Sequence, residues 1–584
     1  MHASLLRRTS VPTLAVMLAG WAAPAAIHAR SGVDTRCIVA SGSAIARCVR
    51  RYADAVTACR VAADTGCETA LRAPGGKLAT LLVATEKPVR DHCTPAAADV
   101  LNIGLGVDDV VSQAAQACER WGRDFIDTAL ADDLTNSSAS TRSCQRTVAE
   151  RLGQLRETVV HAYGRRCDVA EFAGRRCNRA ERDRRIARAR AGALHQIVRR
   201  CGATFDVLEL VSSASGAMLE DRVDELANVV EVRSRHLALR AYPPLSLGAT
   251  AFPGPHPVGV RTLALVDAAR LNPSGTGPRA LTTEVYYPST AEAVAGVPGD
   301  IVKVLGVPLF PTPSFRDVAR APGTFPLLVY SPGSGEPRFI HLSLMLHLAS
   351  HGYVVIGVDH EGNDLLSPSG DPQTLVNRPR DMSVLIDQFL GFDETPGHFL
   401  EGAIDADRIG AFGHSFGGYT VLALAAGPFG LGTFTDPRVK AIMPLDASPQ
   451  VFEASGDAPG IFTTIHVPTL LFGGTLSPFL EPRIQTVFDT IPAGPTLVAF
   501  ADLRDAGHGT FTDVCEVPDN LLLAFGGIPF ECLPMTLPWR YARHLVDYLA
   551  LNFFDATLNA DGAALANLAS ARLATVEDIM WQAK

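Results

Sequence analysis

Short hydrophobic runs alternate with helical stretches along the second half of the chain, from about residue 253. The runs are rich in β-branched residues, and segments such as 341–351 and 380–390 between them have helical character. Strands that alternate with helices predict a mainly parallel sheet with helices on both faces. The predicted buried strands are 327–330, 354–358, 409–412, 439–443 and 469–472, followed by a strand around 497–500.

The N-terminal part of the chain has a different pattern. It is rich in Ala, Arg and Leu, with few β-branched runs and few Gly or Pro interruptions. Apolar positions such as Ile186, Leu194, Ile197 and Cys201 recur at helical spacing, so helices are the predicted element here.

Ten of the twelve cysteines lie between Cys37 and Cys201, and their spacing repeats. Cysteines 37, 59, 67 and 93 are 22, 8 and 26 residues apart, and cysteines 144, 167, 177 and 201 are 23, 10 and 24 residues apart. The tripeptide Asp-Val-Leu follows each block, at 99–101 and 206–208. We predict an internal duplication of about 108 residues, covering 37–101 and 144–208, with Cys48 and Cys118 as an extra pair. Spacing does not determine connectivity, and without a Cys-x-x-Cys pair we expect disulfides rather than metal sites.

The first 29 residues have the pattern of a secretory signal peptide. Arg7 and Arg8 precede an apolar run from Val11 to about Ile27, and small residues follow up to Ala29. No later segment reaches the ~18 uncharged apolar residues that a membrane span needs. We therefore expect cleavage near Ala29 and an exported protein, a location in which disulfides persist. The sequence does not distinguish periplasm from medium.

Charge is divided between the two regions. The composition is globular, with 47% hydrophobic and 19% charged residues, and excludes disordered and multi-span membrane classes. Residues 30–200 carry 28 basic and 20 acidic side chains, whereas residues 201–584 carry 22 and 41. Eight arginines lie from Arg175 to Arg190. They are interpreted either as a solvated helix face or as a surface that contacts an anionic membrane or cell-wall polymer. That stretch has no aromatic residue to stack on bases, and the chain has no overall basic excess, so no nucleic-acid partner is expected.

A Gly-x-Ser-x-Gly motif follows the strand at 409–412 and precedes an Ala-rich helix. In this context the motif predicts a nucleophile elbow with Ser415 at its tip. Gly413 and Gly417 are small, so the strand and the helix can approach each other, and the hydroxyl stands at a helix N-terminus that favours a developing anion. A glycine-rich turn with an idle serine is the alternative. We expect His414 to be a packed elbow residue rather than the base.

A general base is expected after the nucleophile in chain order. His508 lies in a glycine-flanked loop after the last strand, where this fold places its base. The alternative is an ordinary surface histidine. His351 and His360 precede the elbow and are interpreted as structural or pocket-lining residues.

The acid of a triad has three candidates. Many hydrolases of this fold carry it in the turn that here spans 473–478, but that turn has Ser477 and no Asp. Asp446 ends the preceding strand, at the carboxyl edge of the sheet. It is the preferred acid, and it would hold His508 in the correct tautomer. Glu481 and Asp505 remain alternatives.

Two backbone amides are expected to form an oxyanion hole. Phe416 N–H directly follows the nucleophile, and Ser334 N–H lies in the Gly-rich turn 331–335 after the strand 327–330. No metal-ligand cluster or cofactor loop is evident, so the predicted site uses neither a metal nor a cofactor.

Several motifs together resemble the plasma-type platelet-activating factor acetylhydrolase family, which is related to dienelactone hydrolase-like and cutinase-like enzymes. They lie in order at 325–335, 348–353, 358–360, 380–382, 413–418 and 445–446, and the similarity covers roughly 250–550. The resemblance implies an α/β-hydrolase fold, with the family's serine, aspartate and histidine at Ser415, Asp446 and His508. It also implies short or oxidised acyl esters, including acetylated phospholipids, as substrates.

The chain departs from that family in three places. The family's usual His-Gly in the oxyanion turn is Pro332-Gly333 here, the segment between Cys515 and Cys532 is a local elaboration, and the N-terminal repeat has no counterpart.

The predicted domain plan has five parts. These are a signal peptide (1–29), a cysteine-rich all-α domain (30–225), a linker (226–250), an α/β-hydrolase domain (251–560) and a tail helix (561–584). The leading hypothesis is an exported serine ester hydrolase with an ester or lipid substrate. The alternatives are a polyester or cutinase-like hydrolase, and a surface-binding protein whose cysteine-rich repeat is the working part.

Overall fold

The computed structural model describes residues 35–584 with several gaps, and residues 33–584 form one compact unit. The gaps are 65, 95–106, 131–133, 135–136, 169, 171–176, 202–218, 242–246, 305, 368–370, 455, 479–482, 495, 518–521 and 523–527. The predicted signal peptide, both Asp-Val-Leu tripeptides, Arg175 and Glu481 lie outside the described residues. None of the helices that the structure describes is both long and apolar enough to cross a bilayer.

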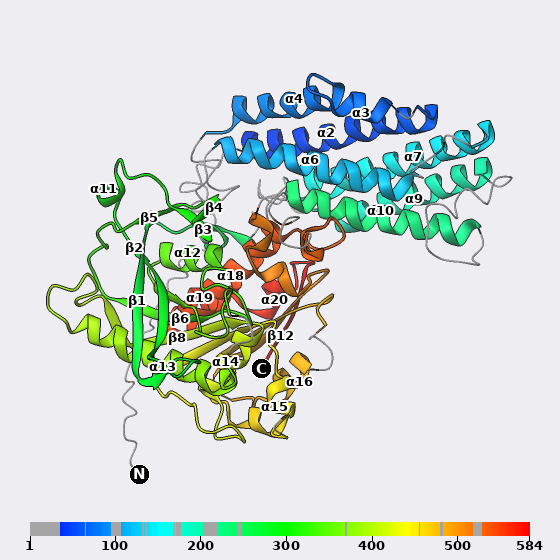
Figure 1. Cartoon of the computed structure of the whole chain (residues 1–584). Helices are drawn as coiled ribbons and strands as arrows, with labels where there is room; N and C mark the ends of the chain where they lie inside the picture. Colours follow the sequence, from blue (N-terminus) through cyan, green and yellow to red (C-terminus); the bar gives the residue numbers. More distant parts are fainter. Residues whose placement is uncertain are drawn as a thin grey trace, which may run out of the picture. The chain divides into compact units, whose positions relative to one another are not determined.

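The N-terminal region is helical, as its sequence pattern predicts (Figure 1). Its long helices pack through apolar faces, with α2 against α4, α6 and α7, and α7 against α9 and α10. The helices are α2 (Thr35–Ala62), α3 (Cys67–Arg72), α4 (Lys77–His92), α6 (Val107–Ala129), α7 (Ala139–Val160), the π-helix η1 (His161–Asp168), α9 (Arg179–Cys201) and α10 (Leu219–Ala241).

Disulfides close this region in a nested pattern that is the same in both cysteine blocks. Cys37–Cys93 encloses Cys59–Cys67, and Cys144–Cys201 encloses Cys167–Cys177. Cys48–Cys118 is formed as the predicted extra pair and joins α2 to α6. Each such bridge contributes about 2–4 kcal/mol, mainly by constraining the unfolded chain.

The second half is built on a ten-stranded sheet in the order β12-β11-β10-β9-β8-β6-β7-β2-β1-β5. Six neighbouring strands of this sheet run parallel: β11, β10, β9, β8, β6 and β7. They include every strand predicted from the hydrophobic runs. The strands of this sheet are β1 (Val258–Leu271), β2 (Pro278–Pro288), β5 (Ser314–Arg316), β6 (Phe325–Ser331), β7 (Val354–Val358), β8 (Ile404–His414), β9 (Val439–Leu445), β10 (Thr469–Gly474), β11 (Val498–Leu503) and β12 (Ile579–Ala583). A separate hairpin pairs β3 (Ile301–Val304) with β4 (Val307–Pro311).

Helices cover both faces of the sheet and bury two cores (Figure 1). One core packs α12 (Leu342–Ser350) and α18 (Trp539–Leu558) against the strands, and the other packs α13 (Thr374–Asp393) and α14 (Phe416–Ala425) on the opposite face. The shorter helices are α11 (Ala291–Val294), α15 (Gln450–Ala454), α16 (Gln485–Thr490), α19 (Gly562–Asn567) and α20 (Ser570–Leu573). The short 3-10 helices are η4 (Ala249–Ala251), η5 (Gly460–Thr464), η7 (His508–Phe511), η8 (Val514–Glu516) and η9 (Phe530–Cys532).

Two predicted boundaries are wrong. Residues 226–241, expected in a linker, continue helix α10, because their apolar side chains pack into the helical region. The expected C-terminal tail helix is instead two short helices followed by strand β12, which pairs antiparallel with β11. The buried Ile579 shows why a strand forms there, since it packs on the sheet core.

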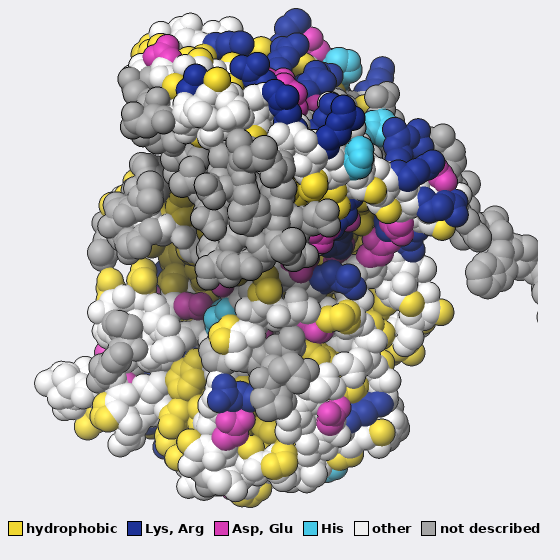
Figure 2. Space-filling view, turned by 90° about the vertical axis from the view of Figure 1, so that its right-hand side faces the viewer, with side chains coloured by type: hydrophobic (Ala, Val, Ile, Leu, Met, Phe, Trp, Pro, Cys, Tyr) yellow, Lys and Arg dark blue, Asp and Glu magenta, His cyan; other side chains and the backbone are white. Residues whose placement is uncertain are grey.

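The basic segment of the helical region is largely paired with carboxylates where the structure describes it. Figure 2 shows Lys and Arg side chains gathered over the upper, helical part of the drawn face. Arg182 donates to both oxygens of Glu577, at 3.1 and 2.9 Å, and Arg190 binds Asp224 at 2.9 Å. Arg184 and Arg188 remain exposed and share Glu181.

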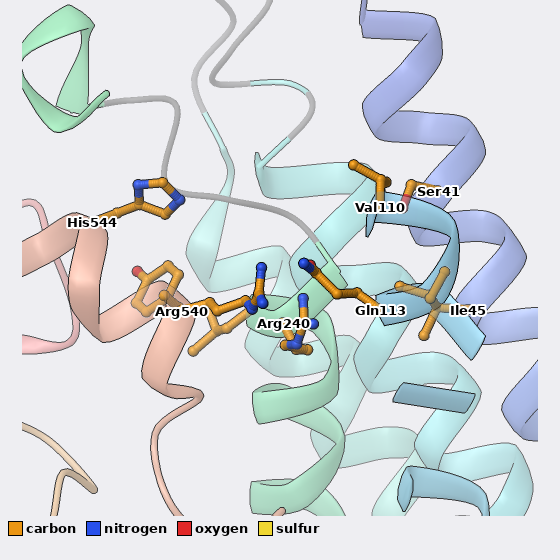
Figure 3. Close-up of a pocket in the computed structure, with 10 residues that line it drawn as sticks. Ser41, Ile45, Val110, Gln113, Arg240, Arg540 and His544 are labelled. Carbon is orange, nitrogen blue, oxygen red and sulfur yellow. The ribbon is translucent and has the colours of Figure 1, made fainter. Parts of the chain in front are cut away.

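A small pocket lies between α2, α6, α10 and α18 (Figure 3). Arg240 and Arg540 both line it, together with Gln113 and His544. Burial and the neighbouring charge of Arg540 lower the pKa of Arg240 to about 9.

A buried ionic network anchors the antiparallel strands to α13. Asp381 accepts two hydrogen bonds of 2.8 Å from Arg279 on β2, one of 2.6 Å from Arg270 on β1, and one of 2.8 Å from His360. Burial alone would raise the pKa of Asp381, but the hydrogen bonds from His360 and Arg279 lower it below its usual value.

We predict that Asp381→Asn lowers the free energy of unfolding by about 3 kcal/mol at pH 7, because Arg279 and Arg270 each lose one of their two carboxylate partners. Since the pKa of Asp381 is lowered in the folded chain, the stability that its ionised carboxylate contributes is present at neutral pH. This stability declines as the pH falls below about 3.9. The control is Asp387→Asn on the same helix, an exposed partner of Arg438, with an expected change under about 1 kcal/mol. Urea unfolding measures both, and equal losses would refute the assignment.

Candidate active site

The predicted elbow lies between β8 and α14. Ser415 separates the two elements with φ 55° and ψ −116°, a conformation that side-chain-bearing residues rarely adopt. Its backbone is held from both sides, since Ser415 N–H donates to Leu445 O at 2.9 Å and Gly418 N–H donates to Ser415 O at 2.9 Å. The neighbouring strand and the first turn of the helix therefore maintain the strained turn.

The glycines of the motif allow β8, α14 and the end of β6 to meet. A Cβ on Gly413 would stand 2.4 Å from Gly417 O, and a Cβ on Gly417 would stand 1.9 Å from Ser331 O. Only hydrogen fits at these positions, so the close approach of strand and helix requires glycine.

Asp446 and His508 come together at the carboxyl edge of the sheet. Asp446 follows β9 directly, is fully buried, and has a φ of 40°. His508 begins η7 after β11, and its Nδ1 is hydrogen-bonded to Asp446 Oδ2. This contact fixes the orientation of the imidazole ring.

Ser477 supports the same carboxylate from the turn after β10. Its hydroxyl donates to Asp446 Oδ2 at 2.5 Å. The turn where many enzymes of this fold carry the acid therefore contributes a hydrogen-bond donor to an acid on the neighbouring strand.

The alternative acid Asp505 has other partners. Its Oδ2 lies 3.0 Å from His236 Nε2 and 3.4 Å from Arg235, both on α10. Burial alone would raise the pKa of Asp505, but His236 and Arg235 lower it. The geometry favours Asp446 over Asp505 as the partner of His508.

The turn after β6 carries the expected second oxyanion donor. Ser334 Oγ accepts a 3.0 Å hydrogen bond from Asn363 Nδ2. The buried Arg378 donates to Asn363 Oδ1 at 2.6 Å, to Ser331 Oγ at 3.0 Å and to Pro332 O. Sequence reasoning missed Arg378, because its role depends on contacts with a turn about 45 residues away in the chain.

His360 and His351 have the contacts of structural residues. His360 lies 2.9 Å from Ser331 Oγ through Nε2, and burial and the charge of Arg378 lower its pKa to about 3. His351 Nε2 contacts Phe252 O at 2.9 Å.

His414 is packed in the elbow and faces two acceptors. Its Nε2 lies 3.0 Å from His508 O, and its Nδ1 lies 3.3 Å from Glu336 Oε2. Burial alone would raise the pKa of Glu336, but His414 lowers it to about 2. Sequence reasoning also missed that Glu336, His341 and His414 bring one possible ligand atom each to within 4.8 Å, the group among the described residues best placed to share a cation.

Comparisons with known proteins identify similar hydrolases. Residues 307–366 match the family model described as platelet-activating factor acetylhydrolase, isoform II. Cutinase est1 of Thermobifida alba is 28% identical over 192 residues, which cover 32% of this chain and 55% of the cutinase. A platelet-activating factor acetylhydrolase of Canis lupus familiaris is 29% identical over 138 residues, 17% of this chain and 31% of that protein. A solved ferulic acid esterase from Streptomyces cinnamoneus has 25% identity and a TM-score of 0.39, covering 56% of this chain and 96% of that one. The chain spans about half, or less, of the curated relatives it matches.

We predict that Gly417→Ala lowers the free energy of unfolding by about 1–3 kcal/mol, because the new methyl group would overlap Ser331 O. The matched control is Gly391→Ala in α13, where a Cβ meets nothing within 4 Å and about 0.5–1 kcal/mol of stabilisation is expected. Thermal unfolding of both variants tests the close packing, and an unchanged melting temperature for Gly417→Ala would contradict it.

Proposed function

We propose that this chain, whose second half is an α/β-hydrolase of the platelet-activating factor acetylhydrolase type, is a serine carboxylic ester hydrolase. Ser415 is the nucleophile, His508 the general base and Asp446 the acid that orients it. The observation that carries the proposal is the hydrogen bond between the buried Asp446 and the half-buried His508, at the same sheet edge as the strained Ser415.

The proposed reaction has two steps. In the first, His508 accepts the proton of Ser415 Oγ as this oxygen bonds to the ester carbonyl carbon. The ester C–O bond then breaks, and the alcohol leaves with the proton from His508. In the second step water loses a proton to His508, attacks the acyl-enzyme and releases the carboxylic acid, and the proton returns to Ser415.

Backbone amides stabilise the charge that develops in both steps. Phe416 N–H, at the start of α14, and Ser334 N–H are the proposed donors to the oxyanion. The N-terminus of α14 adds a favourable dipole. The side chains named in these steps need no cofactor.

Similarity to the acetylhydrolases supports short or acetylated acyl esters, including phospholipids, as the substrate class. The Cys515–Cys532 disulfide closes a segment next to the base, where Glu531 Oε1 accepts the Gly509 N–H at 3.0 Å. Phe530 of this segment is 45% exposed, which fits a lipid or acyl contact.

The first test is hydrolysis of p-nitrophenyl esters from acetyl to octanoyl. We expect activity on short chains that falls by about 10³–10⁴ in Ser415→Ala and Asp446→Asn and survives in Glu481→Gln. A folded wild-type chain without activity on any ester would overturn the proposed function.

The Ser477 hydrogen bond gives a finer prediction. Ser477→Ala should lower kcat about tenfold, equivalent to roughly 1.4 kcal/mol, because the buried Asp446 carboxylate loses one donor. Ser570→Ala, on an exposed helix, is the matched control. If kcat is unchanged while the protein remains folded, Ser477 does not support the acid.

The proposed lipid contact has its own test. Phe530→Ser, combined with Phe525→Ser in the same Cys515–Cys532 segment but outside the described residues, should reduce turnover of a micellar ester and spare a soluble acetyl ester, because only the micellar ester needs an apolar surface. Equal rates on micelles before and after the substitution would remove this proposal.

The similarity to a cutinase favours a second candidate, a polyester hydrolase with the same triad. Release of soluble products from polyester film, compared with turnover of a short soluble ester, distinguishes the two. Faster reaction with the polymer would support the cutinase-like function.

Export and an anionic surface contact also remain proposals. The disulfides fit an oxidising compartment, and exposed Arg184 and Arg188 are available for the contact. Sedimentation of the full chain with anionic vesicles, with and without Arg184→Ala and Arg188→Ala, tests the surface-binding role.

A further inference from the structure

Three side chains from separate parts of the fold converge between the oxyanion turn and the elbow. Glu336 follows the turn after β6, His341 caps α12, and His414 ends β8. His341 and His414 are each at most 1% exposed. One atom from each side chain can reach a shared point, since the three candidate atoms lie within 4.8 Å of one another.

Hydrogen bonds from outside the cluster orient both rings toward that point. His341 Nδ1 pairs with Tyr330 Oη at 2.6 Å, and His414 Nε2 pairs with His508 O at 3.0 Å. When both outer nitrogens donate, the inner nitrogens, His341 Nε2 and His414 Nδ1, carry bare lone pairs. Metal-binding histidines are held in this way by a hydrogen bond from the second ring nitrogen.

Hydrogen bonding among the inner atoms is incomplete. His341 Nε2 is buried and has no hydrogen-bond partner among the described residues. His414 Nδ1 and Glu336 Oε2 are 3.3 Å apart, whereas a charge-assisted hydrogen bond is typically about 2.7–2.9 Å. Two ligands about 2.1 Å from a tetrahedral ion are separated by about 3.4 Å, close to the observed spacing.

We propose that Glu336, His341 and His414 bind a divalent transition-metal ion, with Zn²⁺ as the best match. Two imidazoles and one carboxylate are ligands that suit zinc, and a water molecule completes a tetrahedral site. Glu336 also accepts the Gly333 N–H at 2.6 Å, which orients its carboxylate from outside the site.

The ion has a structural role in this arrangement. Glu336 connects it to the oxyanion turn, and His414 connects it to the backbone of His508. One ion therefore joins the two loops that flank Ser415, and it takes no part in bond breaking. The proposal does not depend on ester hydrolysis.

The test measures metal content rather than activity. The full-length chain, purified without a metal-affinity tag, is incubated with Zn²⁺, freed of excess by gel filtration and analysed by elemental mass spectrometry. We expect about one zinc per chain in the wild type, and an affinity at least about tenfold lower in His341→Ala and Glu336→Gln. Substitution with Co²⁺ should give the absorption bands of a tetrahedral cobalt site.

Two controls address folding and specificity. His347→Ala removes another buried histidine, whose Nε2 has no hydrogen-bond partner within the described part of the chain, and should retain the zinc. Glu336→Gln preserves side-chain size, and circular dichroism checks that it folds. The proposal would be overturned if wild type and His341→Ala bound equal amounts of zinc, or if the wild type showed neither bound zinc nor cobalt bands. In that case a proton, rather than a metal ion, lies between His414 and Glu336. A chain that binds zinc but hydrolyses no ester would refute the proposed esterase function and leave the proposed metal site intact.

Discussion

The backbone at Ser415 is the constraint on which the hydrolase half depends. A serine with φ 55° persists only where its surroundings impose that conformation, and here β9 and the first turn of α14 both hold it. Gly413 and Gly417 allow this because their missing side chains let α14 approach β8 and Ser331. The elbow places the hydroxyl, the helix N-terminus and the β6 turn at one edge of the sheet. Asp446 and His508 meet at the same edge.

Neighbouring parallel strands bring the candidate residues together. Asp446 lies at the end of β9, next to β8, and Ser477 reaches it from the turn after β10. Because parallel strands end at the same edge, a carboxylate on either strand can reach the histidine loop. Here the turn after β9 carries the carboxylate that binds His508, and the turn after β10 supplies a hydroxyl to the same carboxylate.

The helical region contacts the segment that carries His508. Arg235 and His236 of α10 bind Asp505, three residues before His508, and Arg120 of α6 donates to Cys532 O at 2.9 Å. The Cys48–Cys118 disulfide joins α6 to α2, and α10 packs against α7. The expected linker at 226–250 begins as part of α10, which ends at Ala241, and the first strand of the hydrolase half begins at Val258.

Local patterns in the sequence were sufficient to predict the parallel strands, the elbow at Ser415 and the candidates Asp446 and His508. Each depends on hydrophobic periodicity, or on a turn at the end of a strand, and both are encoded within about ten neighbouring residues. Residues 561–584 lacked such a signal, because β12 is a strand only through its pairing with β11. The disulfide pairing, the Asp381 network and the cluster of Glu336, His341 and His414 were decided by the tertiary structure. Their members are far apart in sequence, and only packing of the folded chain brings them within bonding distance.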